Sequence, residues 1–363
     1  MPQTQADHIS ELRNAFKKNK LTLYLGAGVS QASGLPSWEE LVLSLYFTTL
    51  KDERVIYELR PFPNYLYALA EWWMKKKKEP LDIIIRKIRA VYDEKDFVRY
   101  LKTTLYASMV DQYTIENFQA DEYLKNEMLK KNSTLNAVID CCKASVPDQK
   151  GLQAIVSYNY DNLVELTLAN EELYEPIWKN GQLPDPAKIP IYHVHGYLPL
   201  QANDISLEEI ILSEEQYNSM SQDAYYWGNF VQMNQLTNTT GLMIGLSLTD
   251  RNMRRILDAV QKMPKQTCNY IVLRRPKYNV PQENDDEMRS ILANSIKYKE
   301  KFVGGRIKDE VKGPQQVQQI IEAIYKFDEE DFINGFNTLG LKVIFINEHK
   351  EIPELLKKIA GKN

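Results

Sequence analysis

The stretch LTLYLGAGVS, residues 21–30, decides the fold expected for this chain. Its first half, Leu21–Leu25, is a short and nearly continuous apolar run, which is typical of a strand buried on both faces of a parallel sheet. Gly26 and Gly28 follow directly and let the backbone turn sharply and approach a phosphate group. The dinucleotide-binding fingerprint of hydride-transfer enzymes would need another glycine at position 31, where this chain has a glutamine, Gln31. The segment alone therefore predicts a strand with a tight turn, and leaves a phosphate-binding role open.

A helix is expected on each side of this strand. Upstream, Ile9, Leu12 and Phe16 recur at helical spacing within residues 5–19. Downstream, Ser37 has the side chain of an N-cap, and the two glutamates after it favour the first turn of a helix that runs to about residue 50. The chain therefore opens with a helix, a strand, a turn and a second helix.

From about residue 52 to residue 150 the sequence is typical of several helices rich in tyrosine, tryptophan, leucine and lysine. Strand and helix patterns then alternate along the remaining sequence. Strands are expected at 153–158, 189–194, 241–246, 269–273 and 341–347, and a further short one is considered at 209–212. Helices are expected at 162–170, 213–220, 223–237, 251–262, 287–298, 314–326 and 352–360.

This alternation predicts the α/β class, with a doubly wound parallel sheet of the Rossmann-like kind. The helical stretch interrupts the sheet after the first strand–helix unit. We therefore expect one α/β domain made of residues 1–51 and 151–363, with an all-helical insertion formed by residues 52–150.

The overall composition is that of a globular protein. Hydrophobic residues make up 44% of the 363 residues, and the net charge of -4 argues against a general nucleic-acid coat. No stretch approaches the roughly 20 apolar residues of a membrane helix, and the polar N-terminal segment does not resemble a signal peptide. Cys141, Cys142 and Cys268 form no disulfide framework, which fits a reducing compartment. A cytoplasmic protein without direct membrane or nucleic-acid binding is expected.

Polar residues follow the second expected strand. Asn159 and Asp161 stand at its carboxyl end, which is the edge where open α/β sheets bind their ligands. An asparagine there can hold a ribose hydroxyl or a water molecule. The structural role of Asp161 would be to cap the helix that follows.

Two histidines end the next central strand. Strand alternation predicts His193 and His195 on one face, and Gly196 suits a turn that exposes His195. A lone histidine is more often structural than catalytic. A metal site is weakly indicated, because no third ligand stands nearby.

The strand after these ends in small residues. Gly245 and Ser247 would let a nucleotide lie against the backbone, whereas Thr249 or Asp250 can equally serve as the cap of the next helix. Because the carboxyl ends of parallel strands share one edge of the sheet, the four strand ends are expected to surround a single crevice.

Five segments resemble the sirtuin-like superfamily of NAD-binding folds, in the family's order. They are LGAGVSQASGLPSW (25–38), SYNYDNLVE (157–165), YHVHGYL (192–198), ILSEEQY (211–217) and MIGLSLTDRNMRRIL (243–257). The combination is most similar to the prokaryotic sirtuin-like branch found in antiphage defence, where the domain acts as an NAD hydrolase. The resemblance implies NAD as the substrate, with nicotinamide and ADP-ribose as products.

The resemblance also implies roles for individual residues. The family's catalytic asparagine falls on Asn159, and its catalytic histidine falls on His195. The expected NAD-binding positions are Gly26, Ala27, Gly28, Ser30, Asp161, Gly245 and Ser247. No metal ligand is implied.

Three departures separate the chain from the protein deacylases of that superfamily. Deacylases carry Asp-Phe-Arg after the proline of the first loop, where Pro36 is here followed by Ser37 and Trp38. They usually hold a structural zinc with two Cys-x-x-Cys pairs, which three cysteines cannot form. The helical insertion replaces the module that would present an acylated peptide. Hydrolysis of NAD is therefore favoured, with NAD-dependent deacylation, ADP-ribosyl transfer and non-catalytic nucleotide sensing as the alternatives.

An unrestrained NAD hydrolase would poison its own cell, so a latent activity is expected. The chain resembles those encoded beside a HerA-type ATPase or a short Argonaute protein, and the resemblance implies such a partner, with the Argonaute protein as the less favoured one. A homo-oligomer is also expected. Trp72 and Trp73 make the insertion the candidate interaction surface, although such aromatic residues can equally form the insertion's own core.

Overall fold

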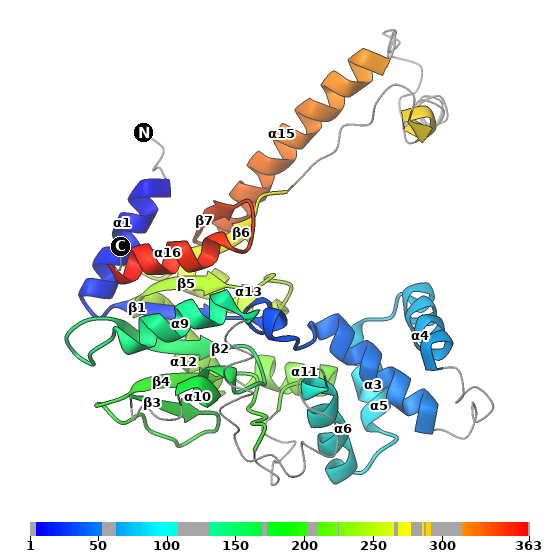
Figure 1. Cartoon of the computed structure of the whole chain (residues 1–363), viewed down its shortest axis with the longest axis horizontal. Coiled ribbons are helices and arrows are strands. Elements are labelled where there is room, and N and C mark those ends of the chain that lie inside the picture. Colours follow the sequence, from blue (N-terminus) through cyan, green and yellow to red (C-terminus); the bar gives the residue numbers. More distant parts are fainter. Residues whose placement is uncertain are drawn as a thin grey trace.

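A computed structural model of the chain describes residues 5–52, 63–107, 131–168, 173–201, 210–223, 225–264, 268–276, 285, 286, 288–291 and 314–361. Within them, seven strands form one sheet in the order β3-β4-β2-β1-β5-β6-β7, and all neighbouring pairs are parallel. The strands are β1 (Leu21–Leu25), β2 (Leu152–Ser157), β3 (Tyr174–Ile177), β4 (Ile189–His193), β5 (Thr240–Ile244), β6 (Asn269–Arg274) and β7 (Leu341–Ile346). The predicted α/β class with a parallel sheet is therefore confirmed (Figure 1).

Strand β1 lies at the centre of the sheet, and both of its faces are covered. All five of its residues are buried, and it pairs with β2 on one side and β5 on the other. Tyr24 belongs to one apolar layer, while Leu23 and Leu25 belong to the other. Its one polar side chain, Thr22, donates a hydrogen bond to the buried Gln235. Burial on both faces explains why this strand is a nearly continuous apolar run.

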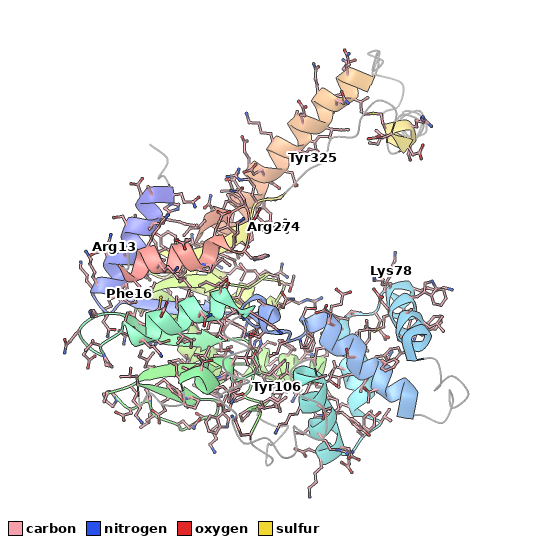
Figure 2. The ribbon with its side chains drawn as sticks, viewed as in Figure 1. Arg13, Phe16, Lys78, Tyr106, Arg274 and Tyr325 are labelled. Carbon is pink, nitrogen blue, oxygen red and sulfur yellow. The ribbon has the colours of Figure 1, made fainter. Side chains whose placement is uncertain are left out.

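Helices cover both faces of the sheet (Figure 1). The larger apolar core lies under α1 (Gln5–Lys17), α9 (Ser133–Lys143), α10 (Leu163–Leu168) and α16 (Glu351–Ala360). The second core lies under α12 (Trp227–Asn238), α13 (Arg251–Gln261) and the C-terminal end of α15 (Pro314–Thr338). The remainder of α15, which carries Tyr325, projects away from the sheet (Figure 1 and Figure 2). None of the described helices is long and apolar enough to cross a membrane.

Between β1 and β2 the described residues form helices, the turns and loops that connect them, and one isolated bridge. This region contains α3 (Trp38–Asp52), α4 (Pro63–Lys77), α5 (Leu81–Arg89), α6 (Glu94–Tyr106) and α9. Ser37 and Glu40 exchange hydrogen bonds at the start of α3, which confirms Ser37 as its N-cap. Helix α3 packs on α4, α5 and α6, whereas α9 packs on α16 and α10. These contacts favour an insertion that begins with α3 and ends before α9, and the boundaries at 52 and 150 stay a prediction.

The structure contains one strand that the sequence pattern did not predict. Strand β3 includes Glu175 and Pro176, residue types that are uncommon in strands, so the sequence pattern did not indicate a strand there. It lies at the edge of the sheet, where proline is tolerated. The short strand considered at 209–212 is wrong over its described part, because residues 210–212 are buried without strand pairing. The helix expected at 287–298 lies largely outside the described residues.

Without the edge strand β3, the strand order is that of the doubly wound dinucleotide-binding sheet. The order of the strands reverses between β1 and β5. Sheets of this topology bind their ligands in the crevice outside the carboxyl ends of the strands at that reversal. The loops after β1, β2, β4 and β5 are therefore the ones that position a site.

Candidate active site

Glycines from two loops pack directly against each other between the ends of β1 and β5. The amide of Gly26 donates to the carbonyl of Ile244 (3.0 Å), and that of Gly28 donates to the carbonyl of Gly245 (3.1 Å). A Cβ atom on Gly26 would lie 2.4 Å from the Gly245 oxygen, and one on Gly28 would lie 2.8 Å from the Gly245 Cα. The close contact between the two loops is thus sufficient to explain why glycine is needed at positions 26 and 28. Ala27 is half-buried and Gly28 is exposed, so the loop still presents backbone to solvent.

Replacing Gly245 with alanine is expected to lower the free energy of unfolding by about 2–4 kcal/mol. Its φ of 68° lies in the left-handed region, and the added Cβ would lie 2.7 Å from the amide nitrogen of Val29. Chemical denaturation measures the change. Gly335→Ala on α15 is the matched control, because nothing lies within 4 Å of its Cβ position. Equal stability of wild type and Gly245→Ala would contradict the packing argument.

Asn159 follows β2, and two hydrogen bonds orient its side-chain amide. Nδ2 donates to the carbonyl of Gly26 and to Oγ of Ser30, at 3.1 Å each. Because a carbonyl can only accept, the nitrogen side of the amide must face the glycine loop. Oδ1 makes no hydrogen bond within the described residues, and the residue is half-buried. The asparagine therefore offers a fixed acceptor for a water molecule or a ribose hydroxyl.

Asp161 supports the orientation of the Asn159 amide through its hydrogen bond with Ser30. Its Oδ2 accepts from the Ser30 hydroxyl (2.8 Å), and its Oδ1 accepts from the amide of Leu163 (3.1 Å) at the start of α10. Burial raises the pKa of this carboxyl to about 6, although both hydrogen bonds lower it. The group is therefore mostly ionised at neutral pH, which keeps Ser30 as its donor. The predicted contact with α10 is confirmed, and both carboxylate oxygens of Asp161 are bonded within the protein.

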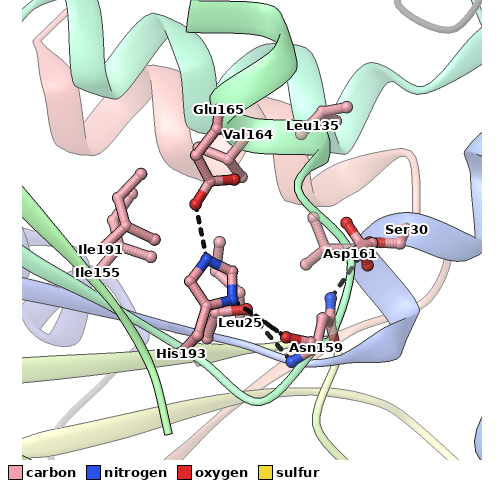
Figure 3. A pocket seen from close by; sticks show the side chains of 12 residues that line it. Leu25, Ser30, Leu135, Ile155, Asn159, Asp161, Val164, Glu165, Ile191 and His193 are labelled. Carbon is pink, nitrogen blue, oxygen red and sulfur yellow. Dashed lines mark hydrogen bonds and ion pairs between the residues drawn. The ribbon is translucent and has the colours of Figure 1, made fainter. Parts of the chain in front are cut away.

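His193 belongs to a buried polar group next to Asn159 (Figure 3). Its Nε2 lies 2.6 Å from Oε1 of Glu165, and the two side chains are only 1% and 6% exposed. Its Nδ1 lies 3.2 Å from the backbone carbonyl of Asn159. Glu165 and His193 line the same small cavity as Asp161. His193 is therefore placed to hold the backbone of Asn159.

His195 has different neighbours from His193, so the prediction that both histidines share one face is wrong. Strand β4 ends at His193, and the chain then turns towards Gly196, whose φ is 111°. Alternation between faces holds only while the backbone stays extended. The turn therefore redirects the side chain of His195.

Two tyrosines and a carboxylate surround His195. Its ring meets that of Tyr158 edge-on at 5.1 Å and that of Tyr217 at 5.7 Å. Its Nε2 lies 3.1 Å from Oδ2 of Asp250. Tyr158 directly precedes Asn159 in the chain, and it is the residue that connects the predicted asparagine with the predicted histidine.

Ser247 occupies the exposed side of the loop between β5 and α13. Its Oγ lies 2.9 Å from Oγ1 of Thr249, and Leu248 between them adopts a φ of 54°. The structure thus brings the glycine loop, Ser30, Asn159 and Gly245 into direct contact, and leaves Ser247 at the solvent side of the same loop.

Sequence reasoning missed two residues around this site. Glu165 is an acid within the apolar run of α10, and such a buried carboxylate needs a partner, which was an available signal. Tyr217 lies in α11 (Glu214–Gln222), and no local pattern could show that it reaches His195. Asp250 was considered only as a helix cap.

None of the three cysteines is among the residues that line the cavity beside Asn159 and His193. Cys141 and Cys142 are buried in α9, and Cys268 precedes β6. Burial raises the pKa of the Cys142 thiol well above its usual range. Within the described part of the chain, no group of three histidine, cysteine, aspartate or glutamate side chains is arranged to hold a metal ion.

Two comparisons with known proteins bear on this geometry. A family model described as a SIR2-like domain matches residues 153–299, from β2 past β6. The NAD(+) hydrolase ThsA of Enterococcus faecium is 22% identical over 372 aligned positions, which cover 98% of this chain and 58% of the relative. The chain thus spans little more than half the length of that relative. Over residues 153–299, which include Asn159, His195 and the strands β2 to β6, this chain is therefore similar to SIR2-like domains.

Proposed function

We propose that the chain is an NAD hydrolase that cleaves the nicotinamide–ribose bond and releases nicotinamide and ADP-ribose. The observation that carries the proposal is the side-chain amide of Asn159, which Gly26 and Ser30 hold with its carbonyl oxygen free. The amide stands at the strand ends where a doubly wound sheet binds nucleotides. The SIR2-like match and the 22% identity to an NAD(+) hydrolase support the assignment.

The proposed chemistry needs positioning and charge stabilisation more than a strong acid. Nicotinamide is cationic in NAD and leaves as a neutral molecule, and the ribose passes through an oxocarbenium-like state. Asn159 Oδ1 accepts a hydrogen bond from the attacking water or from a ribose hydroxyl and lies beside the developing positive charge. His195 accepts the proton, directly or through a ribose hydroxyl.

The remaining predicted residues would hold the nucleotide. The backbone of Gly26, Ala27 and Gly28 would face the diphosphate, while Gly245 and Ser247 would contact a ribose. Ser30 and Asp161 act on NAD through Asn159, because their own polar atoms are engaged with each other and with the asparagine.

The test is product analysis after incubation of the purified chain with NAD. Equal amounts of nicotinamide and ADP-ribose, formed without an added peptide, are expected. Nicotinamide release that depends on an acylated peptide or a protein acceptor would instead identify a deacylase or an ADP-ribosyl transferase. Tight binding of ADP-ribose without turnover, under every activating condition, would identify a nucleotide sensor.

We propose further that the enzyme is a cytoplasmic, latent effector of antiphage defence that depletes NAD. The support is the resemblance of the five strand-end segments to that branch of the family. Its activity is proposed to depend on a HerA-type ATPase, with a short Argonaute protein as the less favoured partner. Co-purification with each candidate, followed by the NAD assay, separates the two.

A homo-oligomer is proposed to form through one face of α4. Leu69, Trp72 and Trp73 share that face and are 51%, 55% and 39% exposed, which is unusual for such large apolar side chains. Changing both tryptophans to serine is expected to shift the particle to a smaller mass in light scattering, with unchanged thermal stability. Phe230→Ser, at an exposed position of α12, is the control. An unchanged mass in the double variant would contradict the proposal.

A further inference from the structure

The two carboxylate oxygens of Asp250 have separate partners. Oδ1 accepts from the amide of Met253 (3.0 Å), which makes Asp250 the N-cap of α13. Oδ2 lies 3.1 Å from Nε2 of His195. Both atoms are buried, and neither makes a hydrogen bond of standard geometry within the described residues, so this 3.1 Å ion-pair contact is the polar contact that the structure gives each of them.

Asp250 is ionised in this environment. The side chains of His195 and Asp250 are only 6% and 18% exposed. Burial raises the pKa of Asp250, but the adjacent His195 and the amides of Met253 and Asn252 outweigh burial, so its pKa falls below the usual range. The neighbouring hydroxyls cannot replace it as an anion, because burial raises the pKa of Tyr158 and that of Tyr217 well above the usual range.

An ionised carboxylate can only accept, so it decides which nitrogen of a neutral His195 carries the proton. Nε2 must be the protonated nitrogen, because a lone pair there would face the negative charge of Oδ2. Nδ1 makes no hydrogen bond within the described residues and keeps its lone pair. The nitrogen available as a base is therefore Nδ1.

We propose that Asp250 is a positioning residue that holds His195 as the Nε2–H tautomer and thereby makes Nδ1 the base. This inference rests on the proposed function for the use of His195. The proton from the attacking water or ribose hydroxyl moves to Nδ1, the oxygen keeps the electron pair, and Asp250 offsets the positive charge of the imidazolium.

The Asp250→Asn variant separates this role from capping. Asparagine caps helices as well as aspartate does, so thermal stability is expected to stay nearly unchanged. Its single carbonyl cannot satisfy both Met253 and His195 Nε2, and its amide would turn a donor towards one of them. A drop in kcat of about 100-fold or more is expected, with little change in KM, because the base is lost while NAD binding remains.

The matched control is Asp93→Asn, which makes the same change at the N-cap of α6. It is expected to leave kcat, KM and stability close to those of the wild type. An Asp250→Asn enzyme with wild-type kcat would overturn the positioning role. A loss of activity that accompanies a loss of stability would show that Asp250 acts only as the N-cap of α13.

Nitrogen NMR of the imidazole tests the tautomer without any turnover. At a pH where His195 is neutral, wild type should carry the proton on Nε2, and Asp250→Asn should lose that preference. A proton on Nδ1 in wild type would overturn the inference even if NAD is hydrolysed. Conversely, a protein that carries the proton on Nε2 but never cleaves NAD would support the pairing of His195 with Asp250 and refute the hydrolase assignment.

Discussion

Asn159→Ala is expected to lower kcat for nicotinamide release by about 10²–10³-fold, because an oriented acceptor next to the reacting centre is lost. Alanine removes both the free Oδ1 and the donor that holds the amide against Gly26 and Ser30. The loss should appear in kcat more than in KM, since the carbonyl is proposed to act on the charge that develops during cleavage. Chromatography of nicotinamide and ADP-ribose under saturating NAD measures the effect.

Two further variants test the same mechanism and supply its control. His195→Ala is expected to reduce kcat by a comparable factor, about 10²–10⁴-fold. Asn234→Ala, at an exposed position near the C-terminal end of α12, is the control and should retain activity. Full activity in Asn159→Ala with an unchanged circular dichroism spectrum would remove Asn159 from the proposed mechanism.

Glu165→Ala is expected to lower the free energy of unfolding by about 3–5 kcal/mol. The carboxylate lies 2.6 Å from the Nε2 of His193, and the two side chains are almost fully buried. Truncation leaves the histidine without its partner in the small cavity that Asp161 also lines, and it loosens the ring that contacts the backbone of Asn159. Urea denaturation at neutral pH measures the loss, and activity should fall together with stability.

An exposed ion pair supplies the contrast. Lys357 and Glu354 pair on α16 with side chains 47% and 64% exposed, so Lys357→Ala should change stability by less than about 0.5 kcal/mol. A Glu165→Ala protein as stable as the Lys357→Ala protein would show that the buried pair contributes nothing net, as some buried pairs do.

Local patterns predicted the fold well because its central strands are buried on both faces. Leu21–Leu25 and Thr240–Ile244 are short apolar runs that end at glycine, and both lie in the middle of the sheet. The edge strand Tyr174–Ile177 escaped prediction because an edge tolerates glutamate and proline. Pattern rules thus worked for the central strands and for the apolar edge strand β7, and failed for β3, whose sequence contains glutamate and proline.

The site could be predicted only in part. Asn159 was assigned from residue type and strand-end position and Ser30 from the family resemblance, and the structure joins them by a hydrogen bond. Their roles in catalysis and binding stay predictions. The separation of His193 from His195 could not be predicted, because it depends on where β4 stops and the turn begins. Glu165 and Tyr217 reach the histidines through tertiary packing, which spacing along the chain does not encode.

The chain of hydrogen bonds from Asp161 through Ser30 to Asn159 has a consequence for affinity. It joins the loops after β1 and β2 through hydrogen bonds within the protein itself. The conformational entropy of the asparagine side chain is therefore lost during folding and is not subtracted again when a nucleotide binds. Cutting the chain at Ser30 would return that entropy to the free protein, so a nucleotide would bind more weakly although none of its own contacts had been removed.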